Sequence, residues 1–158
     1  MEVVGFKAFN YDMSNNNGII FEEKKVYEVD GKIKYGNGGN GFHFCKNLED
    51  TLRYYNGMSK LIKIASVKGI GKIKESYDDY YGYYDLYVTN KLYVERIYTR
   101  EEIINYILNK DPFYIERFLM GFKLTKEELE YFKMIFSDYS RIINTISYYQ
   151  EGKINVYK

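Results

Sequence analysis

Several residue types that carry chemistry are scarce in this sequence. It has one cysteine, one histidine, one proline and no tryptophan. The single cysteine, Cys45, excludes an internal disulfide, so nothing requires an oxidising compartment. No apolar run approaches the roughly 18 residues that a membrane helix needs, and the first residues lack the basic-then-apolar layout of a secretory signal. We therefore expect a cytoplasmic protein that is neither exported nor anchored in a membrane.

A charge excess of either sign is also lacking. The chain has 23 basic and 22 acidic residues and a formal net charge of +1. Without a strong positive field, there is little counterion release to drive binding to a polyanion, so nucleic-acid binding is unlikely. The same balance argues against an acidic mimic of DNA or RNA. The composition therefore favours other kinds of partner.

Hydrophobic and aromatic residues are abundant, at 46% and 19% of 158 residues. That content is too high for a disordered chain. At this length about two-thirds of the unfolded surface can be buried, which suits one compact domain. We expect a single folded unit.

The first half of the chain has the patterns of β-structure. Extended segments are predicted at 3–9, 19–29, 61–67, 70–77 and 86–98, with a short one at 42–44, giving roughly six strands. We expect the first two to pair, and the third and fourth to form a hairpin. A glycine-rich loop at 36–41 and a short helix at 48–56, with Asn47 as its N-cap, lie between them.

The second half changes to helical periodicity. Thr99 with Glu102 and Thr125 with Glu128 form capping boxes, and Asp111-Pro112 is a helix start. Apolar residues then recur at gaps of three and four, which predicts one long helix over 126–150. The fold class is therefore α+β: an antiparallel sheet with one short helix over 1–98, followed by a helical subdomain over 99–158 packed on it. The apolar stripe of 126–150 is core or, alternatively, the contact of a homodimer.

Few residues offer catalytic or metal chemistry. His43 and Cys45 lie two positions apart and share a strand face, but zinc needs three or four ligands, so we predict no metal site. Cys45 lacks an adjacent base to act as a nucleophile. The loop at 36–41 lacks the lysine and serine or threonine of a phosphate-binding loop. The residues by themselves predict no cofactor.

The segment 77–85 is the densest aromatic run. Its tyrosines Tyr80, Tyr81, Tyr83 and Tyr84 are a residue type that recognition surfaces favour, because the ring supplies rigid contact area at low entropic cost. One interpretation is a protein-binding loop. The alternative is a hairpin tip whose rings cover neighbouring strands.

Four segments resemble an uncharacterised domain of unknown function from phage and prophage proteins: GFKAFNYDM at 5–13, VYEVDGK at 26–32, GFHFCKNLEDTLRYY at 41–55 and VTNKLYVERIYTREE at 88–102. The resemblance covers about residues 1–102. It implies a mobile-element setting.

A second resemblance is to ADP-ribosyltransferases of the poly-ADP-ribose polymerase type, carried by the GFHF run at 41–44 followed by Tyr54. The resemblance implies that His43 replaces the strand tyrosine, that Tyr54 stacks on nicotinamide, and that Lys7 and Asp85 take the positions of the first-strand histidine and the catalytic glutamate. Three of these four residues differ in type from the family's. NAD would be the cofactor only on this alternative.

These observations lead to three functional hypotheses. The first is a small phage or prophage accessory protein that binds a host or defence protein, as an inhibitor of the anti-CRISPR type would. The second is an NAD-dependent mono-ADP-ribosyltransferase or its inactive relative. The third is a structural or self-assembling phage component.

Overall fold

A computed structural model gives the fold, and it describes residues 2–15, 17–34, 39–54, 61–76 and 86–152. The strands of the described residues are β1 (Val3–Asn10), β2 (Lys25–Glu28), β3 (Phe42–Cys45), β4 (Ile62–Gly69), β5 (Ile73–Ser76), β6 (Leu86–Thr89) and β7 (Lys91–Ile97). The helices are η1 (Leu48–Tyr54), α1 (Arg100–Leu108), α2 (Pro112–Gly121), α3 (Lys126–Ile135), α4 (Ser140–Thr145) and η2 (Ile146–Gln150). The predicted α+β class is confirmed.

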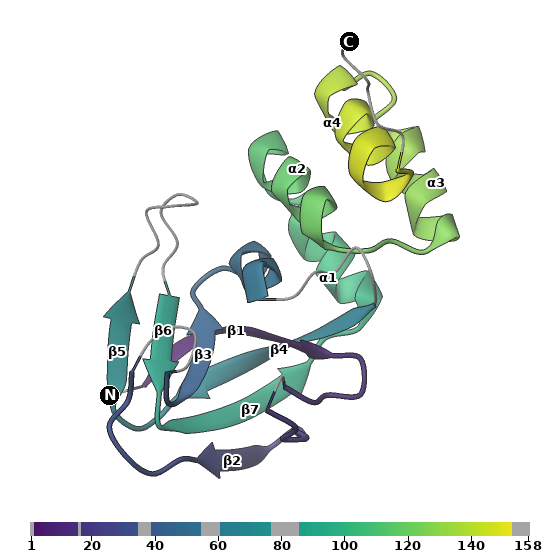
Figure 1. Ribbon diagram of the computed structural model, residues 1–158. Helices are drawn as coiled ribbons and strands as arrows, with labels where there is room; N and C mark the ends of the chain where they lie inside the picture. The colour runs from purple at the N-terminus through teal and green to yellow at the C-terminus, as the bar shows by residue number, and fades with distance from the viewer. Residues whose placement is uncertain (1, 16, 35–38, 55–60, 77–85, 153–158) are drawn as a thin grey trace.

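The strands form one antiparallel sheet in the order β2-β7-β4-β1-β3-β6-β5. Figure 1 shows that β5 and β6 run at a steep angle to β4 and β7, so the sheet is strongly twisted. The helices lie beyond one face of the sheet, and α2, α3 and α4 extend away from it. Among the described residues, no helix is both long enough and apolar enough to cross a membrane.

Each face of the sheet has its own hydrophobic core. Alternate residues of β4 supply both: Ile62 and Ile64 face the helices, whereas Ala65 and Val67 face the other side. This alternation is the period of two expected of a strand that is covered on both faces. The helical face is packed by η1 and the helices α1 to α4, including fully buried Phe118, Phe122 and Phe132.

The opposite face is covered by the chain between β1 and β2. Phe21, from this connection, is buried with its ring centroid 5.0 Å from that of Phe9 and 5.9 Å from that of Phe42. Met13, which has a positive φ of 68°, is also buried there. The connection thus covers the second core.

The predicted strand pairings were wrong. β1 pairs with β3 and β4, not with 19–29, and only the last part of that segment, β2, is a strand, paired with β7. The segments 61–67 and 70–77 do not form a hairpin, because β4 lies beside β1 and β7 while β5 pairs with β6. Pairing depends on which strands lie side by side in space, and local periodicity carries no information on that.

The sheet also turns a corner that the sequence did not indicate. The predicted strand 86–98 is divided at Asn90 into β6 and β7, which are not neighbours in the sheet. A second corner, between β4 and β5, lies beside the corner at Asn90. Hydrogen bonds join the two corners: Lys72 N donates to Asn90 Oδ1 at 2.7 Å, and Ile70 N donates to Lys91 O at 2.9 Å. At these two corners, both segments of the chain pass from one half of the twisted sheet to the other.

The predicted helix starts are confirmed, but the predicted length of the last helix is wrong. Both capping boxes are present, with Thr99 and Thr125 each accepting a hydrogen bond from the N3 amide. The single helix over 126–150 is wrong, because α3 ends at Ile135 and α4 begins at Ser140. Between them Phe136 and Tyr139 leave the helical conformation, with ψ values of 22° and 90°. The break lets α4 pack against α2.

Candidate functional site

Two of the residues implied by the transferase resemblance lie in contact. Lys7, on β1, donates from Nζ to the backbone oxygen of His43, on β3, at 2.7 Å. Burial lowers the pKa of the Lys7 ammonium to about 8, although the electrostatic influence of the neighbouring Cys45 acts in the opposite direction. The Lys7 amine therefore bridges β1 and β3 next to their single paired position, Phe6 with Cys45.

Of the other two implied residues, the structure describes only Tyr54, and of Tyr54 only the backbone. Tyr54 is the last residue of η1, which follows β3 directly, but its side chain is not described. Asp85 lies outside the described residues, and the next residue, Leu86, pairs with Cys45. The strand order thus brings β1, β3 and β6 side by side. The predicted binding tyrosines Tyr80, Tyr81, Tyr83 and Tyr84 also lie outside the described residues, as do residues 36–38 of the glycine-rich loop.

The contact between β1 and β3 requires a glycine. A Cβ at Gly5 would meet the Cys45 carbonyl oxygen and would lie 2.9 Å from Phe44 Cδ2. Only a residue without a side chain allows this approach. Gly5 therefore sets the spacing that allows Lys7 to reach His43.

Cys45 is fully buried and His43 partly buried. Within the described ranges, no three histidine, cysteine or acidic side chains are grouped so that they could hold a metal ion.

A groove lies between α2 and the start of α4. Its volume is about 370 Å³, and Pro112, Phe113, Glu116, Asp138, Tyr139 and Arg141 contribute to its lining. Phe113 and Tyr139 are 59% and 52% exposed, which is unusual for two aromatic rings beside one groove. The lower range of ligand-pocket volumes is about 300 Å³, so the groove can hold one or two side chains.

The charges in this groove are mainly acidic. Arg141 Nε donates to Glu116 Oε1 at 3.1 Å, but the Arg141 side chain is 84% exposed and the pair is therefore weak. Glu116 itself is only 16% exposed. In the part of the chain that the structure describes, Asp138 has no hydrogen bond or ion pair. The groove thus presents two rings with two carboxylates and one loosely held guanidinium.

The sequence did not predict that Tyr139 and Phe113 lie beside one surface groove. The apolar stripe predicted for one long helix includes Tyr139, which is exposed, whereas Phe132 and Ile146 of the same stripe are fully buried. The signal that could have identified the break is Ser137-Asp138, a polar pair typical of a turn. The predicted homodimer contact over 126–150 stays a prediction that no observation tests; on α3 the exposed apolar residues of this range are Tyr131, Met134 and Ile135.

A second polar cluster joins η1 to the helices. Arg117 Nη2, on α2, donates to the buried Asp50 Oδ1 at 3.0 Å. Asn47, predicted to accept a hydrogen bond as an N-cap, instead donates from Nδ2 to Asp50 Oδ2 at 3.2 Å. The neighbouring Glu49 is buried, and its Oε2 has no hydrogen-bond partner among the described residues. Burial raises the pKa of Glu49, and the adjacent Asp50 carboxylate adds to the rise.

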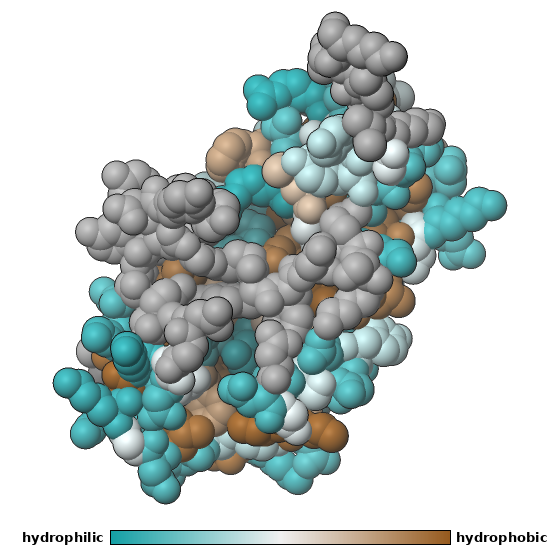
Figure 2. Space-filling view, viewed as in Figure 1, coloured by the Kyte–Doolittle hydropathy of each residue, from teal (hydrophilic) through white to brown (hydrophobic). Residues whose placement is uncertain are grey.

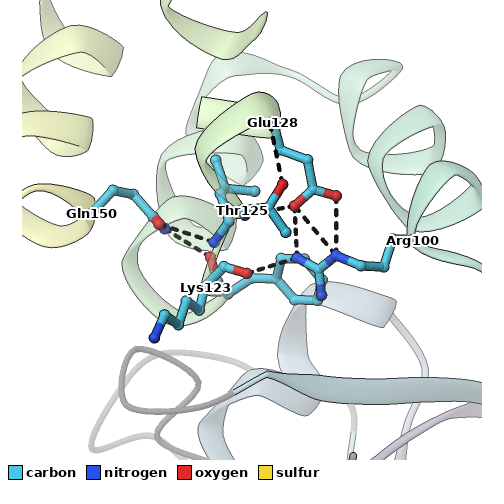
Figure 3. Close-up of polar contacts among 7 residues, drawn as sticks. Arg100, Lys123, Thr125, Glu128 and Gln150 are labelled. Atoms are coloured by element: carbon cyan, nitrogen blue, oxygen red, sulfur yellow. Dashed lines mark hydrogen bonds and ion pairs between the residues drawn. The ribbon is translucent and has the colours of Figure 1, made fainter. Parts of the chain in front are cut away.

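A third network ties the helices to one another (Figure 3). Arg100 Nη2 donates to Glu128 Oε1 at 2.8 Å and to the Lys123 oxygen at 2.7 Å. Gln150 accepts from the Leu124 amide at 3.1 Å and donates to the Phe122 oxygen at 2.7 Å. These contacts fix the link between α2 and α3, and they hold η2, which follows α4 directly, beside it. The groove is thus built on a braced scaffold.

Exposed apolar residues also occur away from the helices. Ile20 and Val26 are exposed near the edge strand β2, and Figure 2 shows hydrophobic surface at that end of the sheet. An edge strand with isolated apolar residues is common and carries no site. The groove between α2 and α4 is therefore our candidate site.

Comparison with known proteins gives a family without an activity. Residues 3–101 match the model of a family described as Domain of unknown function (DUF7666). No curated protein and no solved structure matches the chain. The match ends at the second residue of α1, so the groove lies outside it. Because the match covers more than half of the 158 residues, this chain belongs to the DUF7666 family.

Proposed function

We propose that this protein acts by binding another protein through the groove between α2 and α4. The observation that carries the proposal is the pair of exposed rings, Phe113 and Tyr139, at one concave site. Aromatic side chains of this kind are enriched among the residues that dominate binding energy at protein interfaces. A groove on a braced helical scaffold also needs little ordering when a partner binds, which lowers the entropic cost of association.

The partner we propose is a host or defence protein, with inhibition of that protein as the outcome. Support for this part comes from the phage and prophage resemblance of residues 1–102 and from the near-neutral charge, which disfavours a polyanion. The tyrosines at 80–84 remain a second proposed contact. They are tested separately from the groove.

The test is affinity capture from a bacterial lysate with three forms of the protein. We expect the wild type to retain a stoichiometric partner and the double variant Phe113→Ser, Tyr139→Ser to lose it. A matched control, Tyr131→Ser with Met134→Ser, removes as much exposed apolar surface from α3 and should retain the partner. Equal capture by all three forms would remove the groove from the proposal. A variant with serine at Tyr80, Tyr81, Tyr83 and Tyr84 then tests the other surface.

A second candidate function is NAD-dependent ADP-ribosyl transfer. The observation that favours it is the strand order, which places β1, β3 and β6 side by side with η1 after β3. Lys7, His43 and Tyr54 thereby come from adjacent elements, whereas Asp85 lies outside the described residues. Against it, the Lys7 amine is engaged by a backbone oxygen. Labelling of lysate protein with NAD should vanish in Asp85→Ala and Tyr54→Ala while the fold persists; labelling that is absent in the wild type as well would end this candidate.

A further inference from the structure

The charges of the groove point to one class of occupant. We infer that it takes a cationic side chain, arginine or lysine, from a flexible segment of the partner that also carries an apolar residue. This inference rests on the proposed function and specifies the chemistry of the segment that is bound. It depends on three features of the groove: its rings, its carboxylates and its own arginine.

The rings suit a cation because the face of an aromatic ring carries negative electrostatic potential. Phe113 and Tyr139 flank the groove and are both more than half exposed. A cation over such a ring is attracted to it, and a guanidinium can also stack on it. The molecule already uses this type of contact beside the groove, where Arg117 Cζ lies 5.7 Å from the centre of the Phe113 ring.

The carboxylates supply the charge that a cation requires. Asp138 lines the groove with no ion pair among the described residues, so its carboxylate is available to a ligand. Glu116 is largely buried and faces the same groove, where desolvation strengthens its attraction for a cation. The lining therefore has two negative charges to one positive.

Arg141 shows that a guanidinium fits at this position. Its Nε lies 3.1 Å from Glu116 Oε1, while most of the side chain remains in solvent. A contact with this much exposure is readily exchanged. A cation from the partner can therefore compete with Arg141 for Glu116. We expect that substitution of Arg141 strengthens the binding of a basic segment.

The probes are two fluorescein-labelled octapeptides, one with two arginines flanking a phenylalanine and one with glutamates in their place. Fluorescence anisotropy at low salt should show the arginine peptide binding at least about ten-fold tighter, as expected for complementary charge at a focused site. Asp138→Asn should weaken it by about five-fold, and Arg141→Ala should tighten it by about three-fold. Glu127→Gln, the same charge change on exposed α3, should alter it by less than about two-fold.

The inference is overturned if the two peptides bind equally, if Glu127→Gln acts as strongly as Asp138→Asn, or if Arg141→Ala weakens binding. Its failure can be told apart from that of the proposed function. Suppose that capture of the partner requires Phe113 and Tyr139, yet the double variant Glu116→Gln, Asp138→Asn retains the partner in full. The proposed function then holds, and the inference of a cationic occupant is wrong. Capture that is indifferent to the rings removes the function itself. Circular dichroism spectra identical to the wild type establish that each variant is folded.

Discussion

The guanidinium of Arg100 holds the carboxylate of Glu128 at both oxygens, with Nη2 to Oε1 at 2.8 Å and Nε to Oε2 at 3.0 Å. Arg100 lies within the family match and Glu128 lies 27 residues beyond its end at 101. The same carboxylate accepts a hydrogen bond from the Thr125 amide in the capping box of α3. One side chain thus starts a helix and also fastens that helix to the family domain.

Glu128→Ala should lower the free energy of unfolding by about 3 kcal/mol. The substitution leaves the largely buried Arg100 charge without its partner and also removes half of a capping box. Urea denaturation at neutral pH measures the loss. Glu127→Ala, an exposed acid in the same helical turn, is the control and should cost about 0.5 kcal/mol at most. Equal losses in the two variants would contradict the role of the Arg100 contact.

Acid should weaken the same contact. Burial alone would raise the pKa of Glu128, but hydrogen bonds from Arg100 and Thr125 outweigh it and hold the pKa below its ordinary value of 4.5. Its contribution to stability is therefore complete above pH 4.5 and is lost as the pH falls through the lower, folded-state value. The difference in unfolding free energy between wild type and Glu128→Gln should shrink on acidification through that range. A difference that is constant with pH would argue against it.

Lys7→Met should change how stability responds to alkaline pH. The pKa of Lys7 is about 8 in the folded protein, against 10.5 as the ordinary value. Between these values the unfolded chain binds the proton more strongly, so deprotonation favours folding as the pH rises. Wild type should therefore gain about 3 kcal/mol relative to Lys7→Met between pH 8 and 10.5. Urea denaturation across that range, with Lys74→Met as an exposed-lysine control, should show this gain for Lys7 alone.

Glu49→Gln should become more favourable relative to wild type as the pH rises. Burial raises the pKa of Glu49, so the folded state binds its proton more strongly than the unfolded state does. The contribution of the protonated carboxyl is fully present below pH 4.5 and is lost as the pH rises through the folded-state value. Glutamine has nearly the same shape and does not titrate. Thermal unfolding at about pH 5 and about pH 7.5 compares the two proteins, and an unchanged difference would show that Glu49 is not coupled to folding.

Gly5→Ala should separate β1 from β3 and cost about 2 kcal/mol of stability. The new Cβ would overlap the Cys45 carbonyl oxygen and crowd the Phe44 ring, and neither backbone nor packed ring can yield easily. Amide hydrogen exchange along β3 should accelerate in this variant. Val4→Ala, at an exposed position next to it, should leave that exchange unchanged. Similar exchange in both variants would show that the close approach is not required.

Local signals in the sequence determined the element types. The capping boxes at Thr99 and Thr125 and the proline at Pro112 start helices where they were predicted, because a cap needs only residues three positions apart. The switch from β to helical periodicity near residue 99 likewise gave the α+β class. The resemblance to a domain over about 1–102 agrees closely with the match at 3–101.

Tertiary structure decided the rest. Which strands pair and where the chain turns its corner at Asn90 both depend on contacts between residues far apart in sequence. The same is true of the groove, because Phe113 on α2 and Tyr139 just before α4 line one groove only in the folded chain. Periodicity indicates which face of a helix or strand is apolar, but it does not indicate which other element packs against that face.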